Sequence, residues 1–206
     1  SGNLEVLNFG VGGYAPDQAY LRYQLDGKAY RPQIVLIGFM YENIRRMVNV
    51  YRPFYLRSAG IPYSKPRFLI EDSRLTLIPN PMTDLADLRD MLPDTRARLD
   101  ELGAHDHWYR IGYRQGPFDG LALVRMAKMA SYQLRGDDII RRDKTYVETS
   151  EAFAVLVAVI ESFCTDAGND GAKPVVIMFP NQDALRIHRT SGTKVYEALI
   201  SALIER

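Results

Sequence analysis

The segment from Gly10 to Ala15, Gly-Val-Gly-Gly-Tyr-Ala, contains the first residues whose types and spacing could do chemistry. It matches the G-x-G-x-x-G/A pattern that holds a dinucleotide pyrophosphate, between an expected strand and an expected helix. In that interpretation Glu42 would bind the ribose, although it lies beyond the usual offset of about 20 residues and Pro16 removes one amide from the helix start. A second interpretation is a turn that needs only glycine torsions.

Two longer segments resemble the second and third sequence blocks of the SGNH/GDSL-type hydrolases. The family's second block reads Asn-x-Gly-x-x-Gly, followed by a helix that opens near a Gln, and residues Asn8 to Gln18 have this pattern. The third block ends a buried strand with Gly-x-Asn-Asp, where this chain has Met40-Tyr41-Glu42-Asn43. Lys173 to Pro180 looks like the family's fourth strand, so the resemblance covers roughly residues 3–50 and 148–206.

The resemblance implies an esterase or acyltransferase that acts on ester-linked acyl groups through a serine nucleophile. It assigns the backbone N–H of Gly13 and a side-chain amide to an oxyanion hole. Strict alignment places Glu42 at the amide position, but an ionised carboxylate cannot donate a hydrogen bond. We therefore expect Asn43 to be the second donor. The structural alternative for Asn43 is a cap of the segment that follows it.

The family's other two blocks are not found in this sequence. No Gly-Asp-Ser occurs, and Ser1 lies too close to the second block to be the nucleophile. We therefore expect the nucleophile outside this chain, in a longer protein. For the family's Asp-x-x-His, the chain offers only Asp183 and His188, whose spacing is two residues too long. A dinucleotide-binding domain and a non-catalytic relative of the hydrolases remain as alternatives.

The apolar runs predict a three-layer, flavodoxin-like α/β fold with a parallel sheet. Leu4–Phe9, Ile34–Phe39 and Val175–Phe179 are the expected strands, and the last two should be buried on both faces. The strand order of such sheets leaves a strand missing between Leu4–Phe9 and Ile34–Phe39. A right-handed crossover between these two strands would place Gly13 and Asn43 at the same sheet edge.

The chain is predicted to form a single domain, with an α/β core of about residues 1–50 and 148–206. The proline-rich residues 51–147 should form an inserted lobe that contains a β-hairpin, Arg67–Glu71 and Arg74–Ile78. Residues 103–119 are expected to be a loop. Helices are expected over Asp17–Leu25, a pair within Leu85–Leu102 broken at Pro93, Leu121–Leu134, Glu148–Ala167 and Thr193–Glu205.

Composition excludes several classes of protein. The 206 residues carry 26 basic and 25 acidic side chains, so nucleic acid is not an expected partner. The single cysteine, Cys164, excludes an internal disulfide. The longest apolar run, residues 152–160, is too short to cross a membrane. Residues 1–4 lack the features of a signal peptide, and the compartment stays open.

The expected partner is a small-molecule, carbohydrate or lipid ester. No cofactor or metal is expected, although His105-Asp106-His107 offers a weak metal-binding alternative. The segment Tyr51–Tyr55 is rich in aromatic and cationic groups and could line an acyl or sugar pocket or simply pack the inserted lobe. Arg45-Arg46 and Arg141-Arg142 are expected to be solvated charges.

Overall fold

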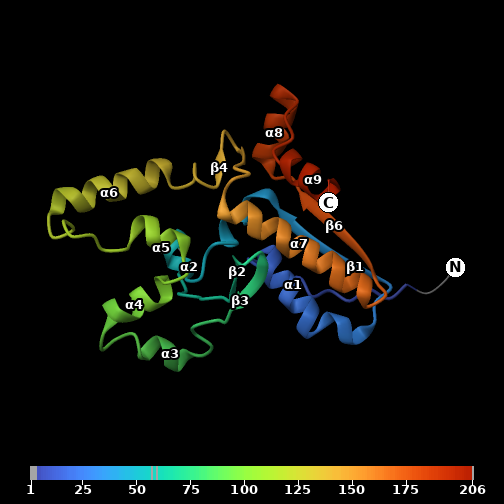
Figure 1. The fold of residues 1–206 in the computed structure, drawn as a ribbon, viewed down its shortest axis with the longest axis horizontal. Coiled ribbons are helices and arrows are strands. Elements are labelled where there is room, and N and C mark those ends of the chain that lie inside the picture. The colour runs from blue at the N-terminus through green and yellow to red at the C-terminus, as the bar shows by residue number, and fades with distance from the viewer. Residues whose placement is uncertain (1–3, 57, 59, 206) are drawn as a thin grey trace.

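The computed structural model describes residues 4–56, 58 and 60–205 as an α/β protein (Figure 1). The strands are β1 (Ile34–Met40), β2 (Arg67–Glu71), β3 (Arg74–Ile78), β4 (Arg141–Arg142), β5 (Thr145–Tyr146) and β6 (Lys173–Phe179). The α-helices are α1 (Pro16–Leu25), α2 (Arg52–Tyr55), α3 (Leu85–Arg89), α4 (Thr95–Gly103), α5 (His107–Gly112), α6 (Ala122–Arg135), α7 (Glu151–Asn169), α8 (Gln182–Ser191) and α9 (Glu197–Ile204). The 3₁₀ helices are η1 (Gly27–Tyr30) and η2 (Tyr41–Arg46).

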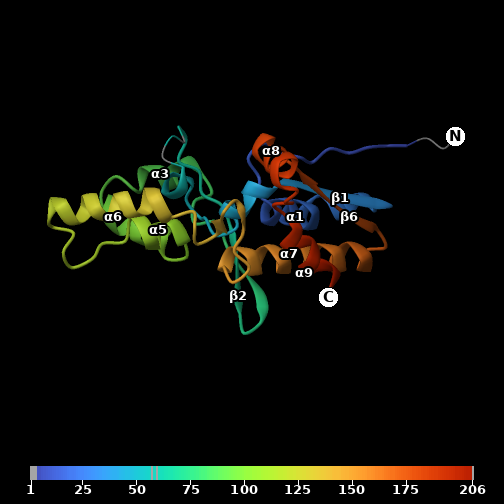
Figure 2. The same cartoon turned by 90° about the horizontal axis from the view of Figure 1, so that it is seen from above.

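The central sheet consists of two parallel strands, β1 and β6, whose register runs from Ile34 opposite Lys173 to Met40 opposite Phe179. Helices α1 and α7 lie together on one side of this sheet, while α8 lies on the other side (Figure 2). A crossover through the lobe and α7 joins the two strands. This small parallel sheet is the part of the predicted α/β architecture that is present in the described residues.

The prediction that β1 is buried on both faces is wrong for this structure. Ile37 and Phe39 are buried toward the helices, whereas Ile34, Leu36 and Met40 point the other way and are 58%, 55% and 46% exposed. The continuous apolar run therefore packs on one face only. Its other face stays apolar, and Ile34, Leu36 and Met40 on it are largely exposed.

The predicted strand Leu4–Phe9 is also absent. These residues are extended, but no backbone hydrogen bond pairs them with another segment among the described residues. Leu4 and Val6 are 86% and 76% exposed. An extended segment becomes a strand only when a neighbouring strand satisfies its backbone groups, and β1 pairs solely with β6 in the described part of the chain.

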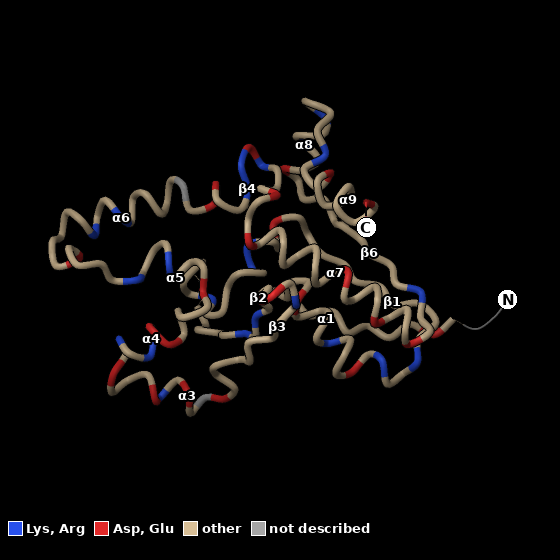
Figure 3. Tube along the Cα trace, viewed as in Figure 1, with Lys and Arg blue, Asp and Glu red and all other residues tan. Residues whose placement is uncertain are grey.

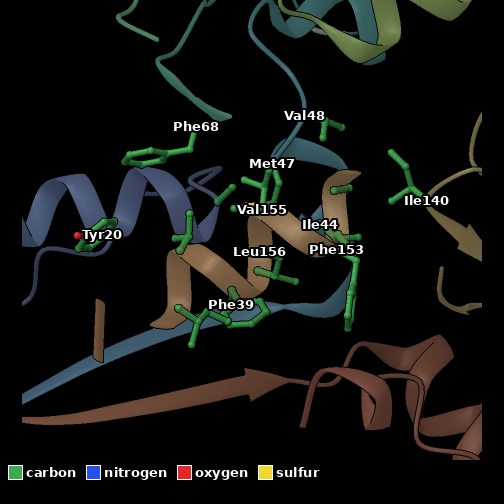
Figure 4. Packing of buried hydrophobic residues seen from close by; sticks show 14 of the residues in the cluster. Tyr20, Phe39, Ile44, Met47, Val48, Phe68, Ile140, Phe153, Val155 and Leu156 are labelled. Carbon is green, nitrogen blue, oxygen red and sulfur yellow. The ribbon is translucent and has the colours of Figure 1, made fainter. Parts of the chain in front are cut away.

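Helix α7 supplies the centre of the hydrophobic core. Its residues Val155 and Leu156 are fully buried between α1, β1 and η2 (Figure 4). Ser150 caps its start by accepting a hydrogen bond from the Phe153 amide at 3.2 Å, so the helix begins at Glu151 rather than at the predicted Glu148. Two tyrosines of α1 bind carboxylates of α7, and these pairs are Tyr20–Asp166 at 2.6 Å and Tyr23–Asp170 at 2.7 Å.

The inserted residues contain the predicted hairpin with its predicted bounds. β2 and β3 are antiparallel and joined at Asp72-Ser73, and the hairpin packs against α7. Helices α2 to α6 extend away from the sheet on one side of the molecule (Figures 1 and 2). Acidic and basic residues are interspersed along the trace, both in the inserted residues and in the rest of the molecule (Figure 3).

Two helices, α5 and α8, lie where the sequence predicted none. α5 interrupts residues 103–119 because Asp106 caps it, accepting from the Tyr109 amide at 3.0 Å. α8 follows β6 because Asn181 accepts from the Ala184 amide at 2.9 Å, and Gly192, with φ of 72°, ends it. The predicted pair of helices around Pro93 is present as α3 and α4, and the final helix as the shorter α9.

Candidate functional site

Gly13 and Asn43 lie together at the carboxyl end of β1. Asn43 follows β1 within η2, is 9% exposed, and its Nδ2 donates to the backbone carbonyl of Tyr14 at 3.3 Å. This contact joins Tyr14, the residue after Gly13, to the segment that follows β1. The structure thus brings together the two residues that the sequence placed at one sheet edge.

The glycine turn has a backbone that an L-residue would strain. Gly13 has φ of 91°, and the Tyr14 amide donates to the Val11 carbonyl at 3.2 Å to close the turn. Within the described part of the chain, the exposed N–H of Gly13 has no acceptor. A backbone N–H and a side-chain amide together bind an oxyanion when both are directed at the same point.

Glu42 is directed away from the glycine turn. Its carboxylate accepts a hydrogen bond from Asn181 Nδ2 at 3.1 Å, and Asn181 follows β6 as the cap of α8. Glu42 therefore joins the ends of the two parallel strands. This contact gives the acidic side chain at position 42 a structural partner.

The start of α1 is poorly suited to a pyrophosphate. Pro16 lies in its first turn and supplies no N–H, and the carboxylate of the fully buried Asp17 follows it. That carboxylate binds the ammonium group of Lys65. An acidic side chain at the helix N-terminus occupies the favourable potential that a phosphate would need. These contacts disfavour the dinucleotide interpretation.

Asp183 and His188 both lie on α8, but they are not paired. Asp183 lies 3.2 Å from the guanidinium group of Arg186, and His188 Nδ1 lies 3.2 Å from the carbonyl of Gly192. Residues five apart on an α-helix point about 140° away from each other. Helix α8 therefore separates the carboxylate from the imidazole, and both side chains are exposed.

Three of the arginines that the sequence assigned to solvent bind protein groups instead. Arg45 Nε and Arg141 bind the carboxylate of Asp137 at 2.6 and 2.7 Å. Arg46 donates from Nη1 to the carbonyl of Gly13 at 2.7 Å and from Nε to the Tyr55 hydroxyl at 3.0 Å. Sequence reasoning missed Arg46 as a neighbour of the glycine turn, although its place just after Asn43 was a usable signal.

The segment His105-Asp106-His107 is structural. The Asp106 carboxylate is buried and accepts from Asn49 Nδ2 and the amides of Val50 and Tyr51 at 2.6–3.1 Å. Burial raises the pKa of Asp106, and these hydrogen bonds oppose the shift. In the described residues, no group of three His, Cys, Asp or Glu side chains is placed to hold a metal ion.

A cavity of about 470 Å³ lies elsewhere, between β2, the start of α5 and the start of α7. The buried Arg67 and the exposed Arg110 line it, and both bind the carboxylate of Glu151. Glu71 also lines the cavity, so its wall carries two guanidinium groups and two glutamate carboxylates rather than charge of one sign. It includes neither Gly13 nor Asn43.

Comparison with protein-family models, with curated proteins and with solved structures gave no match. Among the described residues, no helix has the length and apolar character needed to cross a membrane.

Proposed function

We propose that this chain is part of an SGNH/GDSL-like esterase or acyltransferase whose serine nucleophile lies outside residues 1–206. The observation that carries the proposal is the hydrogen bond from Asn43 Nδ2 to the carbonyl of Tyr14, at 3.3 Å. It holds a side-chain amide against the residue that follows Gly13, at the carboxyl end of β1. Ligand sites of open parallel sheets lie at that end of the strands.

The free edge of β1 supports the position of the missing nucleophile. Within the described residues β1 pairs only with β6, and the extended residues 4–9 run along the other side without pairing (Figure 2). A further parallel strand between them would satisfy both sets of backbone groups. The full protein would then have the three-layer, flavodoxin-like sheet, with the serine at the end of the added strand.

The proposed reaction uses Gly13 and Asn43 as donors to a developing negative charge. The serine Oγ attacks the ester carbonyl carbon while a base takes its proton, and the carbonyl oxygen becomes an oxyanion. The Gly13 N–H and the Asn43 amide donate to this oxygen, and collapse of the intermediate expels the alcohol. His188 remains the candidate base within this chain, and it would act without Asp183.

The test compares variants of the complete gene product in the hydrolysis of p-nitrophenyl acetate. Asn43→Ala should lower kcat by about 10² to 10³ with little change in KM, because the lost hydrogen bond forms in the transition state. Asn169→Ala, at the exposed end of α7, is the matched control. The 206-residue chain alone should be inactive.

Two outcomes would contradict the proposal. One is turnover by residues 1–206 alone that a single Ser→Ala change within them abolishes. The other is a complete protein that neither hydrolyses the ester nor reacts with a fluorophosphonate, which would favour a non-catalytic relative.

A further inference from the structure

Two arginines flank the glycine turn, and neither has a carboxylate partner in the described part of the chain. Arg46 comes from η2 and Arg52 from the first turn of α2, so two different elements bring their guanidinium groups to one place. Arg46 Nη1 lies 2.7 Å from the Gly13 carbonyl oxygen. Arg52 Nη1 lies 4.0 Å from the position that a Cβ on Gly13 would occupy. Both cations are therefore neighbours of the same exposed residue.

The bonds of Arg46 leave its positive charge uncompensated. Both acceptors, the Gly13 carbonyl and the Tyr55 hydroxyl, are neutral. The neighbouring Arg45 differs, because it binds the carboxylate of Asp137. The two contacts of Arg46 fix its guanidinium group in position and leave Nη2 available to another acceptor.

The side chain of Arg52 has fewer polar contacts than that of Arg46. Among the described residues, its side chain makes no hydrogen bond or ion pair, and its Nε is buried without a partner. Eight arginines of the described residues differ from Arg52. Each of the following has a carboxylate oxygen within 3.3 Å: Arg22, Arg45, Arg67, Arg96, Arg98, Arg110, Arg141 and Arg186.

Nearby acidic groups are already engaged. Glu42, three residues after Phe39, binds Asn181 on the side of β6, and Asp17 binds Lys65. Two guanidinium groups beside one glycine repel each other unless an anion lies between them. Planar guanidinium groups bind carboxylates and phosphates well because they present parallel N–H donors.

We propose that Arg46 and Arg52 form an anion-binding subsite beside Gly13 and Asn43, and that the substrate is an ester with a carboxylate or phosphate group close to its acyl linkage. That the bound anion is part of a substrate rests on the proposed function. Binding of the anion itself does not depend on catalysis. The anionic group would be held by the two arginines while the ester carbonyl faces Gly13 and Asn43. An acidic sugar and a phosphorylated glycerol both have this chemistry.

The test is a calorimetric titration of the 206-residue chain with two anions and their neutral counterparts. Glucuronate is paired with methyl glucoside, and glycerol 3-phosphate with glycerol. We expect at least one anion to bind, the neutral compounds not to bind, and binding to weaken as salt increases. Preference for glucuronate would indicate an acidic carbohydrate, and preference for glycerol 3-phosphate a phospholipid or a phosphorylated metabolite.

Arg52→Gln is the decisive variant, because the Arg52 side chain makes no hydrogen bond or ion pair with the described residues that the fold would lose. It should weaken anion binding by about tenfold. Arg46→Gln should do the same, although it also removes the bond to Gly13. Arg186→Gln, which lies in an exposed ion pair on α8, should bind as the wild type does. Circular dichroism before each titration confirms that the variants are folded.

The subsite is refuted if neither anion binds, or if Arg52→Gln and Arg186→Gln bind equally well. These results leave the esterase proposal untouched, because activity of the complete protein on neutral esters is measured separately. Conversely, the complete protein could have no esterase activity while the chain binds an anion and Arg52→Gln loses this binding. That result would support the subsite and contradict the proposed function.

Discussion

The ammonium group of Lys65 binds the carboxylate of Asp17, and both side chains are almost completely removed from solvent. Asp17 belongs to the first turn of α1, while Lys65 precedes β2 in the inserted residues. The pair therefore joins the helix that follows the glycine turn to the inserted lobe. Lys65 also donates to the Pro66 carbonyl at 3.2 Å, and Asp17 accepts from the Gln18 amide at 2.8 Å.

Removing one partner of this pair should be much worse than removing both. Lys65→Met leaves the Asp17 carboxylate buried and uncompensated, and it should lower the free energy of unfolding by about 3–5 kcal/mol. The double variant Asp17→Asn with Lys65→Met should recover most of that loss, because no charge then remains buried. Urea unfolding at pH 7 measures both. Equal losses in the single and double variants would show that the pair matters only through packing.

The imidazole of His107 should make the protein less stable in mild acid. Burial, followed by the positive charge of Arg110, lowers the pKa of His107 to about 4. The unfolded chain has a histidine pKa of about 6.5, so it binds the proton more readily between pH 6.5 and 4. Stability is therefore complete above pH 6.5 and falls as the pH decreases, by up to about 3 kcal/mol.

Urea unfolding of the wild type at pH 7 and at pH 4.5 measures this loss. His107→Gln should lose clearly less stability between the two pH values, because its side chain does not titrate. His188→Gln is the matched control, since His188 is exposed on α8, and it should follow the wild type. A pH dependence that is the same in all three proteins would exclude His107 as its source.

Two adjacent glycines should respond differently to alanine. Gly13 has φ of 91°, so Gly13→Ala should cost about 1–3 kcal/mol of unfolding free energy through backbone strain. Gly12 has no positive φ, and a Cβ there would meet no atom within 4 Å. Gly12→Ala should therefore stay within about 0.5 kcal/mol of the wild type. Thermal unfolding compares them, and equal effects would argue against strain at Gly13.

The features that the sequence predicted well depend on local signals. The hairpin of β2 and β3 follows from alternating residues around Asp72-Ser73. The meeting of Gly13 and Asn43 was also predicted, although its premise, a crossover between two paired strands, does not hold because Leu4–Phe9 pairs with no strand among the described residues. The role of these two residues as oxyanion donors stays a prediction, as do the boundaries of the core and the lobe.

The features that the sequence did not predict depend on partners that are distant along the chain. Leu4–Phe9 has the composition of a strand, but it has no neighbouring strand in the described residues. Lys65 and Asp17 are 48 residues apart, and no spacing rule connects them. Arg46 looked like a solvated charge because its acceptors, the Gly13 carbonyl and the Tyr55 hydroxyl, are brought to it only by the folded chain.

The hairpin turn offers a route to a more stable protein. Asp72 and Ser73 both have left-handed backbones, with φ of 49° and 60°, which is the conformation of a type I′ turn. Glycine adopts it without the cost that a side chain incurs, although glycine also adds entropy to the unfolded chain. The balance predicts that Ser73→Gly raises the unfolding free energy by about 0.5–1 kcal/mol.

Ser201→Gly is the matched control. Ser201 is exposed within α9, where glycine should lower stability by about 0.5 kcal/mol. Urea unfolding distinguishes these opposite signs, and a loss of stability in Ser73→Gly would show that the turn in solution is not of this type.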